Sequence, residues 1–145
     1  MNTIVRKIDE NNIDKDIINT AAGILQKGGL VAIPTETVYG LAGDALSKKA
    51  AKNIYKAKGR PSDNPLIVHI ADINDLNIIS KDVSEDAIKL AKKFWPGPLT
   101  MVLNKSDKVP KSTTGGLDTV AVRMPSNKIA LEIIKKSGVY ILFAF

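Results

Sequence analysis

The stretch from residue 47 to residue 70 constrains the fold most, because it joins a capped helix to a buried strand through a rigid polar loop. Ser47 is a good helix N-cap, and the run from it to Lys58 has apolar residues at the three- and four-residue spacings of a buried stripe. Gly59 accepts left-handed backbone and ends the helix. The apolar, β-branched run 66–70 then predicts a short buried strand.

The loop between this helix and this strand carries more chemistry than a plain connection needs. Lysines in the last helical turn, a glycine after it and a proline beyond are ordinary helix-end signals. They do not explain the guanidinium of Arg60 and the amide of Asn64, or the chain's only histidine, His69, in the strand beyond. Two prolines leave the loop little conformational entropy to lose, which suits a phosphate-binding loop. These residues alone leave both interpretations open, a helix end and an anion site.

Helices and strands alternate along the whole chain. Some connections are long enough for crossovers and others are short enough for hairpins, which predicts a twisted α/β sheet, mixed parallel and antiparallel, flanked by helices. With 145 residues and 44% hydrophobic composition, the chain can form one domain with a real core, and we expect a single domain over 1–145. The predicted strands are 3–8, 30–33, 66–70, 99–103, 119–123 and 139–145, and the predicted helices are 13–27, 48–58, 72–79, 84–95 and a last one from Ser126 or Asn127 to 136.

The composition excludes several classes of site. There is no cysteine, so disulfides, thiolate metal sites and cysteine nucleophiles are absent, as expected in a reducing cytoplasm. Apolar runs are shorter than a signal peptide or a membrane span requires, and we expect a cytoplasmic protein without membrane contact. The net charge of +6 favours anionic partners such as nucleotides or RNA, although most lysines are scattered along helices. A nucleotide would need a cradle other than a Walker A loop or a G-x-G-x-x-G turn, because neither is present.

Four motifs in fixed order resemble the YrdC/YciO family. Each motif is weak alone, but their order is specific, and the resemblance covers essentially residues 10–139. It implies a single YrdC-like domain whose twisted sheet forms a concave basic cleft. The motifs are Pro34-Thr35-Glu36-Thr37-Val38-Tyr39-Gly40-Leu41, Lys58-Gly59-Arg60-Pro61 with Asn64-Pro65-Leu66, Trp95-Pro96-Gly97-Pro98-Leu99-Thr100, and Val120-Ala121-Val122-Arg123-Met124-Pro125.

The activity that the resemblance implies is that of threonylcarbamoyl-AMP synthase, a nucleotidyltransferase that joins L-threonine, bicarbonate and ATP and releases pyrophosphate. Its product would pass to threonylcarbamoyl-transferase proteins that modify tRNA to threonylcarbamoyladenosine, and tRNA is a further partner to test. Such chemistry needs no enzyme nucleophile, because a carbamate formed on the threonine amine attacks the α-phosphate. The protein must orient two anionic partners and neutralise the triphosphate charge. Mg²⁺ is expected with ATP, held largely by phosphates and water.

Seven residues are implied for the two ligands, with no nucleophile, general base or protein metal ligand among them. Arg123 would be the fork for the threonine carboxylate. On general grounds, His69 could instead be a satisfied histidine at the end of a core strand, Arg123 a surface ion pair and Trp95 a core residue. The residues implied for ATP are Lys58, Arg60, Asn64 and Thr119, and those implied for L-threonine are Thr35, His69 and Arg123.

The match with the family departs from its pattern at residues 140–145. A Pro-Ser-x-Asn segment follows in the family, and its serine and asparagine complete the nucleotide site; here the sequence continues as Tyr-Ile-Leu-Phe-Ala-Phe. Phe143 stands where a small residue would line the substrate pocket. We therefore expect a domain that lacks its C-terminal elements, with weakened or absent turnover and with its upstream ligand loops kept.

Two other functions stay open on the sequence. The first is a non-catalytic RNA-binding or regulatory module that uses the same basic surface, for which salt-dependent tRNA binding without ATP consumption would be diagnostic. The second is a carbamoyl-transfer relative, like the YrdC-type module of hydrogenase maturation proteins. That module usually accompanies zinc-finger-like and acylphosphatase-like regions, and neither is visible in this sequence.

Overall fold

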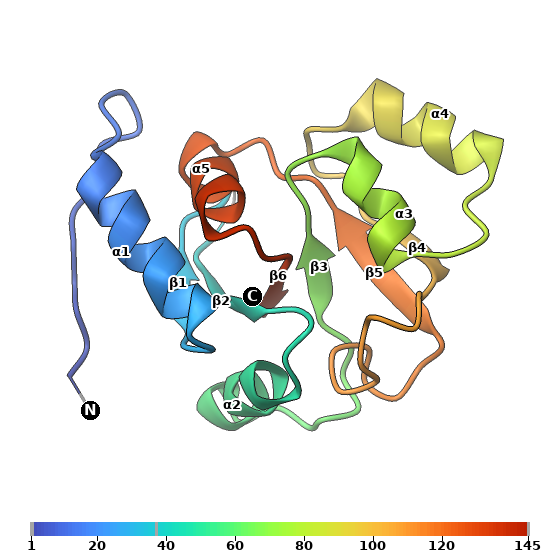
Figure 1. Cartoon of the computed structure of the whole chain (residues 1–145), viewed down its shortest axis with the longest axis horizontal. Helices are drawn as coiled ribbons and strands as arrows, with labels where there is room; N and C mark the ends of the chain where they lie inside the picture. Colours follow the sequence, from blue (N-terminus) through green and yellow to red (C-terminus); the bar gives the residue numbers. More distant parts are fainter. Residues whose placement is uncertain (1, 37, 145) are drawn as a thin grey trace.

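The computed structural model of the chain describes residues 2–36 and 38–144. Within these residues, six strands form one mixed sheet in the order β1-β2-β6-β3-β5-β4 (Figure 1). β3 and β5 run parallel and all other neighbours pair antiparallel, so the predicted mixed α/β sheet is confirmed. The elements are α1 (Lys15–Gln26), β1 (Val31–Ile33), β2 (Gly40–Asp44), α2 (Lys48–Lys58), β3 (Ile67–His69), η1 (Ile73–Asp75), α3 (Leu76–Ile79), α4 (Glu85–Phe94), β4 (Met101–Asn104), β5 (Thr119–Arg123), α5 (Lys128–Ser137) and β6 (Ile141–Ala144).

The ends of α2 and the start of α5 carry the capping residues that the sequence predicted. The Ser47 side chain accepts a hydrogen bond from the Ala50 backbone N–H at the start of α2. Gly59 ends that helix in the left-handed region, with φ 63°. Of the two residues predicted to cap the last helix, Asn127 does so, because its side chain accepts from the first backbone N–H groups of α5. The helix before the candidate phosphate loop therefore stops where the sequence predicted.

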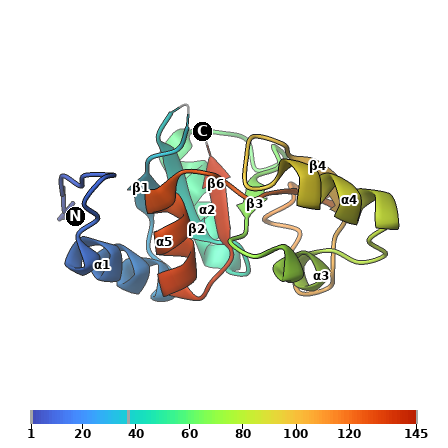
Figure 2. The same cartoon turned by 90° about the horizontal axis from the view of Figure 1, so that it is seen from above.

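The helices cover the two faces of the sheet unequally. α1 and α5 lie side by side over β1, β2 and β6, and their apolar side chains form one core with Ile33 and Phe143 (Figures 1 and 2). The opposite face carries a larger core, to which α2, α3 and α4 contribute together with Val68 and Val122. Trp95, at the end of α4, belongs to this second core and donates from Nε1 to the Leu99 carbonyl over 2.7 Å, as expected of a core residue.

One half of the α1/α5 face has no helix over it among the described residues. Ile67 of β3 and Val102 of β4 are both register partners of Ala121 in β5, so the three side chains share that face. Val102 is 66% exposed, and Ile67 and Ala121 are partly exposed. The β3-β5-β4 part of the sheet therefore offers an open surface beside the α1/α5 layer.

Two predictions about strands were wrong. Residues 3–8 form no strand, and Ile4 and Val5 stay 55% and 82% exposed, so their alternating pattern finds no sheet to join. β2 was missed because its sequence, Gly-Leu-Ala-Gly-Asp, is poor in strand-forming side chains. Its small residues are explained by packing, since a Cβ at Gly43 would lie 3.1 Å from a Leu30 methyl and 3.2 Å from Ile54. β2 is thus a strand whose sequence is set by the close approach of α2.

Replacing Gly43 with valine should destabilise the protein by about 1–3 kcal/mol, because the added methyl groups overpack the contact between β2 and α2. Gly23 is a matched control, since an added Cβ there meets nothing within 4 Å inside α1. The Gly23→Ala change should instead stabilise by up to about 1 kcal/mol through helix propensity. Urea unfolding of both variants measures the difference, and equal effects would contradict the packing explanation for Gly43.

Candidate functional site

Two of the three residues predicted for L-threonine meet at the ends of the parallel strands. His69 ends β3 and Arg123 ends β5, and the two are direct register partners. Thr35 lies just after β1, where its hydroxyl donates to the Val38 carbonyl and accepts from the Val38 backbone N–H at 3.3 Å. The loop that carries Thr35 reaches Arg123 through its next residue, Glu36. Thr37, which belongs to the same motif, lies outside the described residues.

The Arg123 guanidinium is held by two protein acceptors. Its Nε donates to the Gly97 carbonyl at 3.0 Å, and its Nη2 donates to the Glu36 carboxylate. The Arg123 side chain is only 9% exposed, so these contacts fix its plane within the protein. Nη1 makes no hydrogen bond to the described residues. Arg123 is therefore an oriented, buried cation and not the surface ion pair that the sequence also allowed.

Glu36 collects donors from the start of α5. Its Oε1 accepts from the Ser126 N–H at 2.6 Å, the Ser126 hydroxyl at 2.8 Å and the Asn127 N–H at 2.7 Å. Partial burial opposes ionisation, but hydrogen bonds from its own backbone N–H and from Ser126 and Asn127 outweigh it and lower the Glu36 pKa from 4.5 to about 2. Sequence reasoning missed Glu36 as a site residue, although it stands inside the first motif.

His69 is fully buried. Its Nδ1 lies 3.3 Å from the Ile67 carbonyl, and its ring packs edge-to-face against Phe143 with centroids 4.2 Å apart. Burial lowers the His69 pKa from 6.5 to about 3, the Ile67 carbonyl opposes this, and the Arg123 charge lowers it further, so the imidazole is neutral at neutral pH. The structure thus gives His69 the environment of a core histidine, and its contact with L-threonine stays a prediction.

Of the four residues predicted for ATP, three precede β3 in the chain and Thr119 begins β5, so they come from the start of the strands that His69 and Arg123 end. Lys58 is exposed at the end of α2, and Arg60 and Asn64 follow in the loop before β3. That loop packs on the segment before β5, since a Cβ at Gly115 would lie 2.6 Å from the Asp63 carbonyl oxygen. The contact brings the loop alongside the segment that leads to Thr119, the first residue of β5.

The two groups of residues are joined by the open part of the sheet. Thr119 and Arg123 are the two ends of β5 and point to the same face, which places them about 13 Å apart at the usual rise of a strand. Between them lies Ala121, on the face that carries no helix in the described part of the chain. The open face therefore runs along β5 from Thr119 to Arg123.

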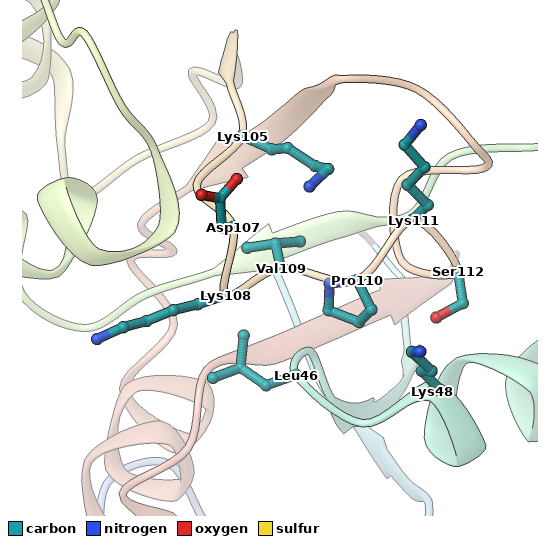
Figure 3. Close-up of a pocket in the computed structure, with 9 residues that line it drawn as sticks. All are labelled: Leu46, Lys48, Lys105, Asp107, Lys108, Val109, Pro110, Lys111 and Ser112. Atoms are coloured by element: carbon teal, nitrogen blue, oxygen red, sulfur yellow. The ribbon is translucent and has the colours of Figure 1, made fainter.

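Two surface pockets lie beside the segment that connects β4 to β5. One, of about 590 Å³, is lined by Leu46, Lys48, Lys105, Asp107, Lys108, Val109, Pro110, Lys111 and Ser112 (Figure 3). The other, of about 640 Å³, extends from Lys48 to Ser62, Asp63 and Gly116. Neither is lined by any of the seven predicted residues. In the described ranges, no three His, Cys, Asp or Glu side chains could together hold a metal ion, and no helix is long and apolar enough to cross a membrane.

Curated proteins of one kind are similar to this chain in sequence. Threonylcarbamoyl-AMP synthase of Pyrococcus abyssi (strain GE5 / Orsay) is 56% identical over 135 residues, which cover 93% of this chain and 39% of that protein. Threonylcarbamoyl-AMP synthase of Bacillus subtilis (strain 168) is 50% identical over 131 residues, or 90% of this chain and 38% of that protein. The chain therefore spans about two fifths of the length of these curated relatives.

The fold itself is shared with a solved relative. The crystal structure of P. abyssi Sua5 complexed with L-threonine matches with a TM-score of 0.90 at 55% identity, over 92% of this chain and 39% of that one. The sequence profile of the Sua5/YciO/YrdC family, described as Telomere recombination, matches residues 23–144. Sequence, fold and motif order thus agree, and the chain belongs to the Sua5/YciO/YrdC family.

Proposed function

We propose that this chain carries the L-threonine- and ATP-binding part of a threonylcarbamoyl-AMP synthase. The observation that carries the proposal is the open β3-β5-β4 surface, with an oriented arginine at one end and the Lys58-Arg60 loop at the other. Relatives at 56% and 50% identity bear that name, and a related structure at 55% identity is a complex with L-threonine.

The chain's own residues would supply binding and charge neutralisation. The Arg123 guanidinium receives the threonine carboxylate, with Thr35 and His69 beside it, and the threonine amine faces along β5. Lys58 and Arg60 hold the triphosphate, while Asn64 and Thr119 complete the nucleotide site. The amine and bicarbonate condense to a carbamate and water. A carbamate oxygen then attacks the α-phosphate, the bond from the α-phosphorus to the bridging oxygen breaks, and pyrophosphate leaves towards the two cations. Mg²⁺ would enter as the ATP complex and neutralise phosphate charge.

The test is pyrophosphate release by the chain with ATP and Mg²⁺, with L-threonine and bicarbonate each present or omitted. Release should require both. Calorimetric titration with L-threonine measures binding apart from turnover, since the chain spans only part of the length of its relatives. Arg123→Ala should abolish threonine binding and leave ATP binding in place. Release without threonine, or a folded chain that binds no threonine, would contradict the proposal.

A further inference from the structure

We infer that Glu36 is the positioning residue of the threonine site: it fixes the guanidinium of Arg123 and anchors the loop that carries Thr35 to the start of α5. The inference rests on the proposed function, because it takes Arg123 as the group that receives the threonine carboxylate. Glu36 itself touches no substrate in this assignment. It acts through Arg123 and through the backbone of the loop.

The hydrogen-bond partners of the Glu36 side chain are all donors, which suits a carboxylate. Its two oxygens accept from four donors on other residues, namely Nη2 of Arg123, the N–H and hydroxyl of Ser126 and the N–H of Asn127. A carboxylate only accepts, so it can satisfy all four, whereas the amide of glutamine would turn its NH2 group towards at least one of these donors. Glu36 is therefore matched in charge as well as in shape to this position.

The same contacts decide which part of Arg123 remains for a ligand. Nε is taken by the Gly97 carbonyl and Nη2 by Glu36, while Nη1 donates to none of the described residues. Because the side chain is 9% exposed and held at both of those nitrogens, its remaining N–H groups, two on Nη1 and the second on Nη2, have fixed directions. A ligand carboxylate would meet a pre-oriented N–H group, and little rotamer entropy would be lost on binding.

Glu36 also connects two segments that are distant in sequence. It lies in the loop between β1 and β2, and its partners Ser126 and Asn127 lead into α5, where Asn127 is the N-cap. Removing the carboxylate should free both the arginine and the loop with Thr35. The expected loss therefore falls on threonine and spares ATP, whose predicted residues lie at the other end of β5.

The experiment compares Glu36→Gln with wild type by calorimetric titration with L-threonine and, separately, with ATP. The dissociation constant for threonine should rise roughly 10-fold, the scale of a hydrogen bond to a charged group, while that for ATP stays unchanged. Glu132→Gln, on the exposed side of α5, is the matched control and should change neither. In the Arg123→Lys background, which keeps a cation but loses the fork, Glu36→Gln should have a smaller effect on threonine than in wild type.

Each outcome separates the inference from the function on which it rests. A wild-type chain that binds no threonine overturns the proposed function and the inference with it. Normal threonine binding by folded Glu36→Gln overturns the inference alone, and tighter binding would mean that Glu36 competes with the ligand, which also overturns it. If Glu36→Gln fails to fold by circular dichroism, Glu36→Asp replaces it; this variant keeps the charge on a shorter side chain and should still weaken threonine binding more than ATP binding.

Discussion

Phe143→Ala should raise the pKa of His69 from about 3 towards its ordinary value of 6.5 and should destabilise the protein by about 3–5 kcal/mol. Phe143 is 1% exposed and packs edge-to-face on the imidazole, so its ring excludes water from the histidine. Its removal leaves a cavity beside a titratable group, and water there lowers the cost of charging the ring. The His69 pKa is read from the pH dependence of its ring signals by NMR, and stability from urea unfolding.

The acid side of the stability curve gives a second readout of the same change. The folded pKa of His69 is depressed below the unfolded value, so the unfolded chain binds the proton more readily between pH 6.5 and about 3. His69 therefore makes stability fall by about 1.4 kcal/mol per pH unit as pH drops through that window. Glu36 adds a loss between pH 4.5 and about 2, because its folded pKa is also depressed. Because Phe143→Ala raises the folded pKa of His69, the pH range over which His69 destabilises the protein should end at a higher pH than about 3.

Two other substitutions control for loss of an aromatic ring. Phe143→Leu keeps an apolar side chain against the imidazole and should leave the His69 pKa low. Phe94 is 47% exposed at the end of α4, so Phe94→Ala should cost about 1 kcal/mol or less and leave His69 unchanged. A His69 pKa that stays near 3 in folded Phe143→Ala would show that Phe143 does not control access to the imidazole.

The order of elements could be predicted because local signals marked most of them. Ser47 and Gly59 bracket α2, and the β-branched run of β5 fell within its predicted limits. β2 could not be predicted, since Gly43 reflects the approach of α2 from a distant part of the fold and not a local preference. The strand predicted over residues 3–8 was wrong for the opposite reason, because Ile4 and Val5 have a strand-like pattern but no neighbouring strand pairs with them.

The candidate site divides in the same way. The order of the motifs predicted Arg123 and His69 as site residues, and the structure places them side by side at the ends of two strands. It could not show that Arg123 is already paired, because Glu36 is 87 residues away along the chain and only the packing of α5 brings them together. Nor could it show that Phe143 closes over His69, since that contact depends on β6 lying between β2 and β3.

Arg60→Ala should lower kcat/KM for ATP by about 100-fold or more, the scale seen when one group that stabilises developing charge is removed. Arg60 follows Gly59, whose backbone is left-handed. The Arg60 backbone N–H donates to the Tyr55 carbonyl at 3.1 Å, so the backbone that carries the guanidinium is fixed. Since the Tyr55 hydroxyl also donates to the Asn64 carbonyl at 2.6 Å, one buried tyrosine holds both ends of the loop. The Arg60 side chain thus extends from a rigid backbone. A positioned charge of this kind can stabilise the transition state more than it stabilises the bound substrate.

Lys56→Ala is the matched control for that change, because Lys56 is an exposed cation in the last turn of the same helix. It should alter kcat/KM for ATP by less than about 3-fold, the scale of a screened surface charge. Arg60→Lys should recover only part of the loss, since an ammonium keeps the charge but not the planar fork. The threonine dissociation constant should stay at the wild-type value in all three variants, because Arg60 lies before the start of β3 and Arg123 lies at the end of β5. Equal losses from Arg60→Ala and Lys56→Ala would mean that kcat/KM for ATP depends on the net charge at the end of α2 and not on the position of the Arg60 guanidinium.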